Sequence, residues 1–271
     1  MHHIGTGKIR DILPQLDATR LAAEIYRKAG VFVVRKALPP AQIAIWQEAW
    51  NEFYSRRLAA GRKVNPFNPV HVEEDSPPAL AAIHRCDSLL DIMEQIYPDL
   101  AFYAQRFVIK DTHSRAPVFL HQDFGYDYGL PEKTAVFIPL SPVSADNGAM
   151  IFYPGTHQCG YLGDAGEIDV SILEPGWPTF CPTLEPGDIV LMHNCTWHAS
   201  LPHKQGLDRI LAHVTYQPAN DPSSRALLRG QWRTDLRLGD IPREKFFKRH
   251  RVGRLTEMQA EIDRLKDGKR A

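Results

Sequence analysis

Cysteine is scarce in this sequence, and no two cysteines lie close together in it. Cys86, Cys159, Cys181 and Cys195 are widely spaced, and no C-x-x-C motif occurs. This absence argues against a disulfide framework and against a cysteine-based zinc cluster. We therefore expect free thiols in a reducing compartment.

Net charge and long apolar runs are missing as well. The 32 Lys and Arg residues balance 32 Asp and Glu residues, so the overall charge favours neither nucleic acid nor a membrane surface as a partner. No stretch approaches the roughly 18 consecutive apolar residues of a membrane span, and the first ten residues lack the apolar core of a signal peptide. The expected location is the cytoplasm, with no membrane or nucleic-acid partner.

What is present is the composition of a globular protein of 271 residues, 44% of them hydrophobic. No linker or repeat interrupts the sequence, which predicts a single domain over residues 1–271. Its first part, to about residue 100, has helical patterning. Apolar periodicity, glycine and proline predict helices over 16–30 and 38–61, one or two further helical pieces within 76–98, and a short strand at 31–35.

Between residues 101 and 218 the sequence consists of short β-rich runs separated by turns. The runs are AFYAQRFVIK, PVFLHQD, TAVFIPL, GAMIFYP, GDIVLMHN and RILAHVTYQ, and the turns include SADNG, PGTH and EPGD. This pattern predicts a sandwich or barrel with the early helices packed outside it. The remaining residues, 219–271, are expected to form a basic and helical tail.

A histidine and an aspartate end one of these runs at a spacing of two. Because residues i and i+2 of a strand face the same side, His121 and Asp123 are able to converge on one point. Two histidines and one carboxylate form the facial triad that holds Fe(II) and leaves positions open for oxygen and a co-substrate. The alternative to a metal site is that the two side chains are simply solvated at the end of a strand, since H-x-D is a common motif.

The third ligand has to come from a later strand. The segment GDIVLMHNCTWHASLPHKQGLDR offers His193, His198 and His203. His198 lies 11 residues before Arg209, so a strand, a turn and a returning strand would bring imidazole and guanidinium into one cavity. Arginine binds carboxylates through two parallel hydrogen bonds, as a dicarboxylic co-substrate requires. His193 is the less favoured ligand, because an odd spacing from His198 points it to the opposite face.

At these positions the sequence resembles the phytanoyl-CoA dioxygenase-like Fe(II)/2-oxoglutarate oxygenases. The resemblance covers roughly residues 100–218 and includes HQD at 121–123, DNGAMIFYPGTH and GDIVLMHNCTWHAS. It implies a double-stranded β-helix, a cupin-like jelly roll that is mainly β with flanking helices. It also implies Fe(II), 2-oxoglutarate and O2 as cofactor and co-substrates. One departure is Phe137, where some relatives carry tryptophan.

The resemblance also implies roles for individual residues. Metal binding falls to His121, Asp123 and His198, and co-substrate binding to Lys110, Ser200 and Arg209. Because halogenating relatives replace the carboxylate, Asp123 favours hydroxylation of a C–H bond of a small-molecule metabolite, with release of succinate and CO2. Desaturation and ring closure by the same oxidant stay open, as does a cupin-like isomerase or ligand sensor that does not turn over 2-oxoglutarate.

Substrate contacts are less well defined by the sequence. Phe124, Tyr126 and Tyr128 follow Asp123 directly and are candidates for the rim of the active site. Residues 225–254 include ten Lys and Arg but only three Asp and Glu. If this tail covers the active site, an anionic substrate would contact Arg229, Trp232, Arg233 and Arg237. The favoured interpretation is instead a solvated basic face. The oligomeric state is not indicated.

Overall fold

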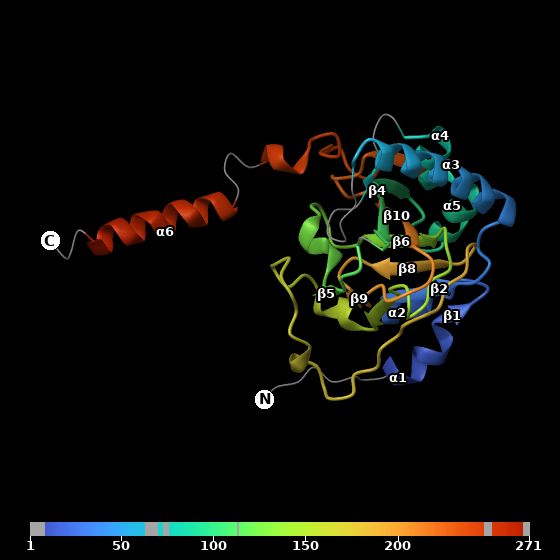
Figure 1. Cartoon of the computed structure of the whole chain (residues 1–271), viewed down its shortest axis with the longest axis horizontal. Coiled ribbons are helices and arrows are strands. Elements are labelled where there is room, and N and C mark those ends of the chain that lie inside the picture. The colour runs from blue at the N-terminus through green and yellow to red at the C-terminus, as the bar shows by residue number, and fades with distance from the viewer. Residues whose placement is uncertain (1–8, 63–69, 73–75, 113, 247–250, 268–271) are drawn as a thin grey trace.

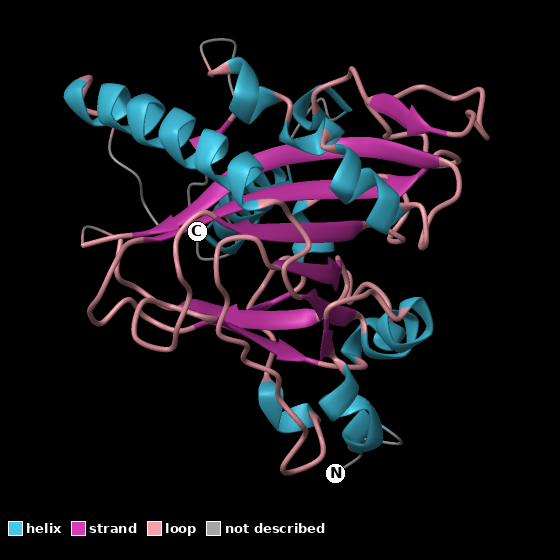
Figure 2. Cartoon of the chain, turned by 90° about the vertical axis from the view of Figure 1, so that its right-hand side faces the viewer, coloured by secondary structure: helices cyan, strands magenta, loops and turns pink. Residues whose placement is uncertain are grey.

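The computed structural model of the chain describes residues 9–62, 70–72, 76–112, 114–246 and 251–267. Two sheets face each other at its centre, and helices cover the outer face of the larger one (Figures 1 and 2). Most neighbouring strands are antiparallel, and neither sheet closes on itself. The predicted mainly β architecture with flanking helices is confirmed, and the core is a jelly roll of the double-stranded β-helix type.

The larger sheet has eight strands in the order β1-β2-β8-β6-β10-β4-β11, with β3 also paired to β4. Its strands are β1 (Asp17–Ala18), β2 (Val31–Val34), β3 (Val70–His71), β4 (Leu100–Lys110), β6 (Thr134–Pro139), β8 (Ile189–His193), β10 (Arg209–Pro218) and β11 (Ala226–Arg229). The smaller sheet has the order β5-β9-β7. Its strands are β5 (Val118–His121), β7 (Met150–Tyr153) and β9 (Trp197–Ser200).

Most of the described α-helices are short, and all of them except α6 precede β4 in the chain. They are α1 (Ile9–Ile12), α2 (Ala23–Ala29), α3 (Pro40–Ala59), α4 (Pro78–Ala81), α5 (Asp87–Met93) and α6 (Arg251–Asp267). The long helix α3 starts at Pro40, where the missing N–H of proline leaves no donor unpaired, and it ends before Gly61, whose φ of 71° suits glycine. None of the described helices is both long and apolar enough to cross a membrane.

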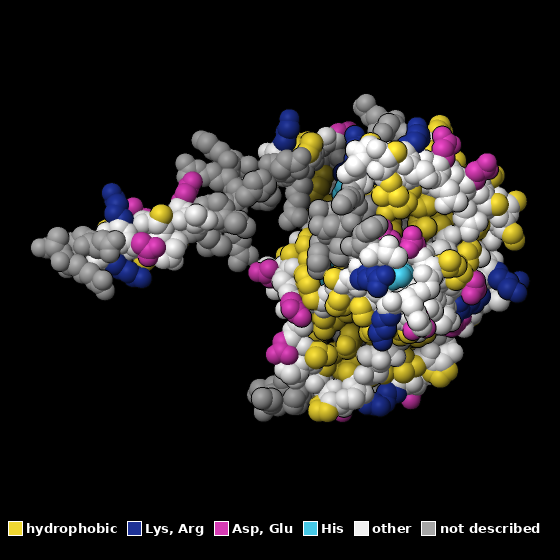
Figure 3. Space-filling view, viewed as in Figure 1, with side chains coloured by type: hydrophobic (Ala, Val, Ile, Leu, Met, Phe, Trp, Pro, Cys, Tyr) yellow, Lys and Arg dark blue, Asp and Glu magenta, His cyan; other side chains and the backbone are white. Residues whose placement is uncertain are grey.

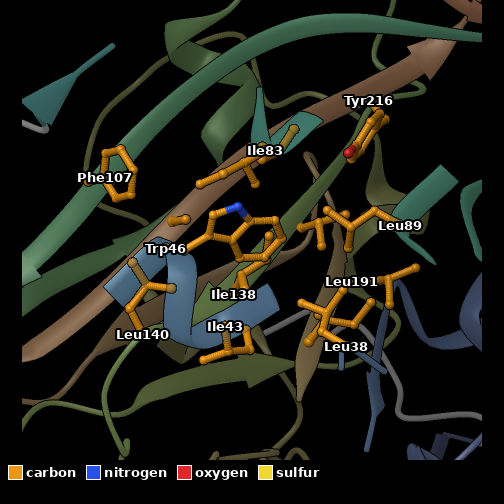
Figure 4. Close-up of a cluster of buried hydrophobic side chains, with 14 of the residues drawn as sticks. Leu38, Ile43, Trp46, Ile83, Leu89, Phe107, Ile138, Leu140, Leu191 and Tyr216 are labelled. Atoms are coloured by element: carbon orange, nitrogen blue, oxygen red, sulfur yellow. The ribbon is translucent and has the colours of Figure 1, made fainter. Parts of the chain in front are cut away.

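Both faces of the larger sheet are buried, as the continuous apolar runs of its strands require. Along β6 and β8, one set of side chains packs with α3, α4 and α5 in the main core, and the alternate set packs toward the smaller sheet. Ile43 and Trp46 of α3 lie against Ile138 and Leu191 of the sheet in Figure 4. One face of β4 and β10 packs in the same main core, which fixes the register of these two strands, and their other face carries much of the site described below.

Two expectations are met only in part. The helix predicted over 16–30 is confined to α2, because Asp17 and Ala18 pair instead with Val33 and Val34 as the edge strand β1. Arg35 holds Asp17 there by an ion pair, a tertiary contact that local periodicity does not reveal. The tail expected over 219–271 is helical in α6, which extends away from the sheets (Figure 1), but Ala226–Arg229 forms the strand β11, which pairs with β4. Residues 247–250 and 268–271 lie outside the described residues.

The surface and the thiols agree with the composition. All four cysteines are free. Lys, Arg, Asp and Glu side chains are interspersed over the face of the molecule shown in Figure 3, as expected for a balanced charge.

Candidate metal centre

Two strands of the smaller sheet bring the predicted ligands together. His121 at the end of β5 and His198 on β9 are partners in the antiparallel register, and their ring centroids are 4.2 Å apart. Asp123 follows in a short 3-10 turn (Asp123–Tyr126), and its Oδ1 lies 3.5 Å from His121 Nε2 and 3.6 Å from His198 Nε2. One ligand atom from each residue lies within 4.8 Å of the others, so the three side chains can share an ion.

Backbone carbonyls set the tautomer of both imidazoles. The Nδ1 of His121 lies 2.8 Å from the carbonyl of Phe119, and the Nδ1 of His198 lies 3.0 Å from the carbonyl of Thr196. A carbonyl only accepts, so each Nδ1 carries the proton and donates it. Each Nε2 therefore presents a lone pair toward Asp123, which is the arrangement that metal-binding histidines use.

Burial makes this cluster favour a cation. Asp123 is 6% exposed. Although burial alone would raise its pKa, the neighbouring side chains of His198, His121 and Arg106 together hold the pKa of Asp123 well below its usual range. Burial, with a smaller contribution from His121, lowers the pKa of His198 to about 4. At neutral pH the centre thus offers one carboxylate and an unprotonated His198, as metal binding requires.

The residue between the two ligands has a different task. Gln122 points away from the cluster, and its amide donates to the carbonyls of Gly160 and Cys195 at 2.7 and 2.8 Å. Its Oε1 accepts from the backbone N–H of Leu162. Gln122 therefore fixes the loop after residue 160 against the strand end from which His121 and Asp123 project.

A cavity of about 300 Å³ opens from the cluster, and its second polar end is formed by Arg209 and Ser200. Arg209 is 1% exposed and donates from Nη1 to the carbonyl of Gly148 at 2.8 Å, while its Nε has no hydrogen-bond partner in the described part of the chain. The Oγ of Ser200 is likewise buried without a partner there. Burial lowers the pKa of Arg209 to about 9, which leaves it charged at neutral pH.

A charged guanidinium buried without an acidic partner is costly unless an anion binds to it. The described residues provide no carboxylate within ion-pair distance of Arg209. Its free Nε and the free hydroxyl of Ser200 thus form a ready carboxylate site. The walls between this site and the metal ligands are apolar and comprise Val108, Val118, Phe119, Phe137, Met150 and Ala199.

Lys110 lies beside this end of the cavity but is not among its lining residues. It is paired with Arg209 in the register of β4 and β10, and it is fully buried. Its Nζ donates to the carbonyls of Ala116 and Leu201 at 2.6 and 2.7 Å. Burial, and then Arg209, lower its pKa to about 7. It therefore lies close to Arg209, but its ammonium group is already bound by two carbonyls of the protein.

Two residues of the site were not anticipated as functional. Arg106 on β4 and His213 on β10 face each other in the strand register, and both line the cavity. Arg106 donates from Nε to His213 Nδ1 at 2.9 Å. Asp123 Oδ2 lies 3.6 Å from Arg106 Nη2 and 3.9 Å from His213 Nε2. The sequence did contain one signal for His213. It lies four residues from Arg209 on one strand, so both side chains point to the same face.

The proposed substrate contacts are only partly brought to the cavity. Tyr126 lines it and is 43% exposed at its rim. Phe124 instead packs edge-on against Tyr161, and the hydroxyl of Tyr128 donates to the carbonyls of Leu238 and Ile241. Neither belongs to the lining residues.

The basic residues of the tail also lie elsewhere. Arg233 pairs with Asp99 at 2.6 Å, Arg229 pairs with Asp87, and Arg237 stacks on Trp232. These contacts agree with the favoured interpretation of a solvated face balanced by acidic side chains. The structure does not bring Trp232 and Arg233 to the cavity lining.

The alternative ligands lie outside the centre. The His193 ring faces His157 at 5.2 Å, and its Nδ1 accepts from the N–H of Cys195. The Nε2 of His157 lies 2.9 Å from the carbonyl of Arg27, and the Nε2 of His203 lies 3.3 Å from that of Leu207. Of the candidate histidines in this segment, His198 is the one that joins His121 and Asp123.

Comparison with known proteins decides the family. The model of the phytanoyl-CoA dioxygenase family matches residues 26–210, which is more than half of the chain and includes the ligand cluster, Ser200 and Arg209. The chain belongs to the phytanoyl-CoA dioxygenase family. No match was found among curated proteins.

Solved structures support the fold of this family. EctD from S. alaskensis in its apoform is similar at 17% identity and a TM-score of 0.62, covering 85% of this chain and 91% of that chain. The non-heme alpha ketoglutarate dependent epimerase SnoN from nogalamycin biosynthesis is similar at 18% identity and a TM-score of 0.59, covering 78% and 85%. The carbocyclase SnoK of the same biosynthesis is 20% identical, with a TM-score of 0.61 and coverage of 74% and 84%. At these identities the likeness concerns the fold, and this family fold supports more than one reaction.

Proposed function

We propose that the chain is an Fe(II)/2-oxoglutarate-dependent dioxygenase that hydroxylates an unactivated C–H bond of a small-molecule metabolite, with O2 as oxidant and release of succinate and CO2. In this proposal His121, Asp123 and His198 hold the ferrous ion. Arg209 and Ser200 bind the distal carboxylate of 2-oxoglutarate. The family assignment supports the oxygenase class, and the reaction type is the further step taken here.

The observation that carries the proposal is that one cavity has two complementary polar ends. One end offers two imidazole nitrogens and a carboxylate oxygen within 4.8 Å, a donor set that suits Fe(II). The other end offers the buried, unpartnered Nε of Arg209 and Oγ of Ser200, a donor set that suits a carboxylate. A keto-diacid that binds metal through one end and arginine through the other matches both. Structures of the same fold hold Fe3+ with alpha ketoglutarate in SnoN, and nickel with 2-oxoglutarate in HygX from Streptomyces hygroscopicus.

The residues of the chain have separable tasks in this reaction. When bound, the iron together with 2-oxoglutarate supplies the oxidising chemistry, as the cofactor does in such enzymes. The Phe119 and Thr196 carbonyls fix the Nδ1–H tautomers, so that both Nε2 atoms face Asp123, and Arg209 orients the co-substrate. The apolar wall around Phe137 and Met150 excludes water from the reacting region.

The choice of hydroxylation rests on the carboxylate ligand. Asp123 occupies a position that halogenating relatives leave without a carboxylate, so a halide is not the group that this chain is expected to transfer. Epimerisation and ring closure are named for SnoN and SnoK. Those reactions use the same oxidant class, and product analysis separates them from hydroxylation.

A second candidate is a cupin-like metal barrel that acts as an isomerase or ligand sensor without consuming 2-oxoglutarate. It needs the three metal ligands but has no use for a buried arginine that lacks an acidic partner. The free donors of Arg209 and Ser200 therefore favour the oxygenase.

Succinate formation tests the proposal. Purified protein with Fe(II), 2-oxoglutarate and O2 is expected to form succinate slowly when no substrate is added. A panel of metabolites is then screened for a compound that increases the rate of succinate formation. Anaerobic calorimetry with Fe(II) is expected to show 2-oxoglutarate binding even before a substrate is known. Failure of 2-oxoglutarate to bind in the presence of Fe(II) would favour the cupin-like alternative.

A further inference from the structure

We propose that Arg106 forms an anion-binding subsite for the substrate, so that the preferred substrate is a small molecule with an apolar body and one carboxylate or phosphate group. This inference rests on the proposed function and adds the chemical class of the substrate. It comes from the position of Arg106, its free donors and the charge balance of the cavity.

Arg106 is the accessible cation of the cavity. Its side chain is 25% exposed, whereas Arg209 is 1% exposed at the deep end. Among the described residues its one hydrogen bond runs from Nε to His213 Nδ1, and the nearest carboxylate oxygen, Asp123 Oδ2, lies 3.6 Å from Nη2. His213 thus fixes the guanidinium of Arg106 through Nε. The terminal N–H groups of Arg106 stay available to donate to a ligand that enters from the open side of the cavity.

Arg106 and Arg209 serve different regions of the cavity. In the register of β4 and β10, Arg209 lies opposite Lys110, and Arg106 lies opposite His213, four residues further along both strands. Four residues of strand span about 13 Å. In the proposed function both charged ends of 2-oxoglutarate already have partners, since the metal takes one end and Arg209 the other. The guanidinium of Arg106 is therefore left for a second ligand.

The charges of the loaded cavity point to the sign of that ligand. The charged lining residues are Arg106, Arg209 and Asp123. The doubly positive iron and the doubly negative co-substrate cancel, so one unit of positive charge remains in a cavity with mostly apolar walls. His213 adds none, because its Nδ1 accepts from Arg106. A carboxylate neutralises the surplus, and a phosphate, which carries a charge of about −1.5 to −2 at pH 7, slightly exceeds it, whereas a cationic substrate would increase it.

The position of Arg106 also places the anionic group of the substrate close to the proposed metal ligands. Arg106 Nη2 lies 3.6 Å from the carboxylate of Asp123, which would hold the metal. The rest of the substrate would contact the apolar side chains of Val118, Phe119 and Met150. The oxidised carbon is therefore expected within a few bonds of the anionic group.

Matched pairs of acid and amide test this inference by binding, without turnover. The anaerobic protein is first loaded with Fe(II) and 2-oxoglutarate, and co-substrate binding is verified by calorimetry. Hexanoate, hexyl phosphate and the neutral hexanamide are then titrated separately. At least one of the two anions is expected to bind at least tenfold more tightly than the amide, and the comparison between them tells carboxylate from phosphate.

Variants assign the preference to Arg106. Arg106→Gln is expected to abolish the preference for anions over the amide and to leave 2-oxoglutarate affinity within about threefold, whereas Arg106→Lys retains part of the preference. Arg233→Gln, which removes a surface arginine paired with Asp99, is the control and should change neither. Because the comparison of acid with amide is made on the unmodified protein, it holds even if a variant folds poorly.

The outcomes separate this inference from the proposed function. If Fe(II) and 2-oxoglutarate do not bind together, the proposed function fails and the charge argument fails with it. If they bind but acid and amide bind equally, or neither anion binds at millimolar concentration, only the inference about Arg106 is overturned. A selective loss of 2-oxoglutarate affinity in Arg106→Gln would make Arg106 a co-substrate residue and would also overturn it.

Discussion

His121 and His198 are register partners on neighbouring antiparallel strands, with ring centroids 4.2 Å apart, although they lie 77 positions apart in the chain. The pairing places both Nε2 atoms beside the same oxygen of Asp123. The metal centre is thus a direct consequence of how β5 and β9 pair in the smaller sheet.

Loss of His198 is expected to abolish metal binding. In His198→Ala one of three converging donors is missing, so we predict that Fe(II) affinity falls by more than about 100-fold, the upper range seen even for outer partners of metal ligands. Anaerobic equilibrium dialysis measures it. His193→Ala is the matched control, because His193 faces His157 instead; an equal loss in both variants would mean that the ligand has been misassigned.

Loss of Arg209 is expected to act on the co-substrate and spare the metal. Arg209→Ala leaves the Fe(II) ligands intact but removes the buried guanidinium, which we expect to weaken 2-oxoglutarate binding by about 2–4 kcal/mol, or roughly 30- to 1,000-fold. Calorimetry on the Fe(II)-loaded variant gives the affinity. A variant that loses Fe(II) binding while keeping its affinity for 2-oxoglutarate would show that the two roles are reversed.

Lys110 should matter more for stability than for co-substrate binding. Lys110→Met removes the buried ammonium group that donates to the carbonyls of Ala116 and Leu201, at a cost of about 2 kcal/mol in the free energy of unfolding. We expect 2-oxoglutarate affinity to fall far less than in Arg209→Ala. Urea unfolding and calorimetry on the same preparation measure both quantities, and a stable Lys110→Met protein that no longer binds 2-oxoglutarate would restore a direct role.

Acid is expected to destabilise the metal-free protein through His193. Burial, with His157 as a lesser cause, lowers the pKa of His193 to about 3, whereas an exposed histidine titrates near pH 6.5. The unfolded chain therefore takes up this proton first as the pH falls. The stability that the neutral imidazole contributes is complete above about pH 6.5 and declines toward pH 3.

The size of this effect follows from the titration. Between pH 7 and 5 the contribution of His193 should decrease by about 2 kcal/mol. The free energy of unfolding is measured at both values for the wild type and His193→Gln, which has no titrating group at this position. The pH dependence should be smaller in the variant by that amount; identical dependence in the two proteins would show that His193 does not remain neutral in the fold.

The sequence was informative wherever one local pattern determines the outcome. The β-rich runs bounded by turn residues predicted β4, β6, β8 and β10 within a few residues, and the i, i+2 rule placed His121 and Asp123 together. Arg106 and His213 were missed because their proximity depends on the register between β4 and β10, which no local pattern encodes. The N-terminal half of the segment 16–30 was misassigned for a similar reason, since the pairing of Asp17 with Val33 overrides its helical periodicity.

Metal-dependent binding of 2-oxoglutarate tests the central claim most directly. Anaerobic calorimetry on the wild type should give one 2-oxoglutarate per chain when Fe(II) is present. Binding should be much weaker without metal, and it should be lost in His198→Ala even with Fe(II) in excess. Binding of 2-oxoglutarate that is the same with and without Fe(II), or that survives in His198→Ala, would contradict the account of a shared metal and co-substrate cavity.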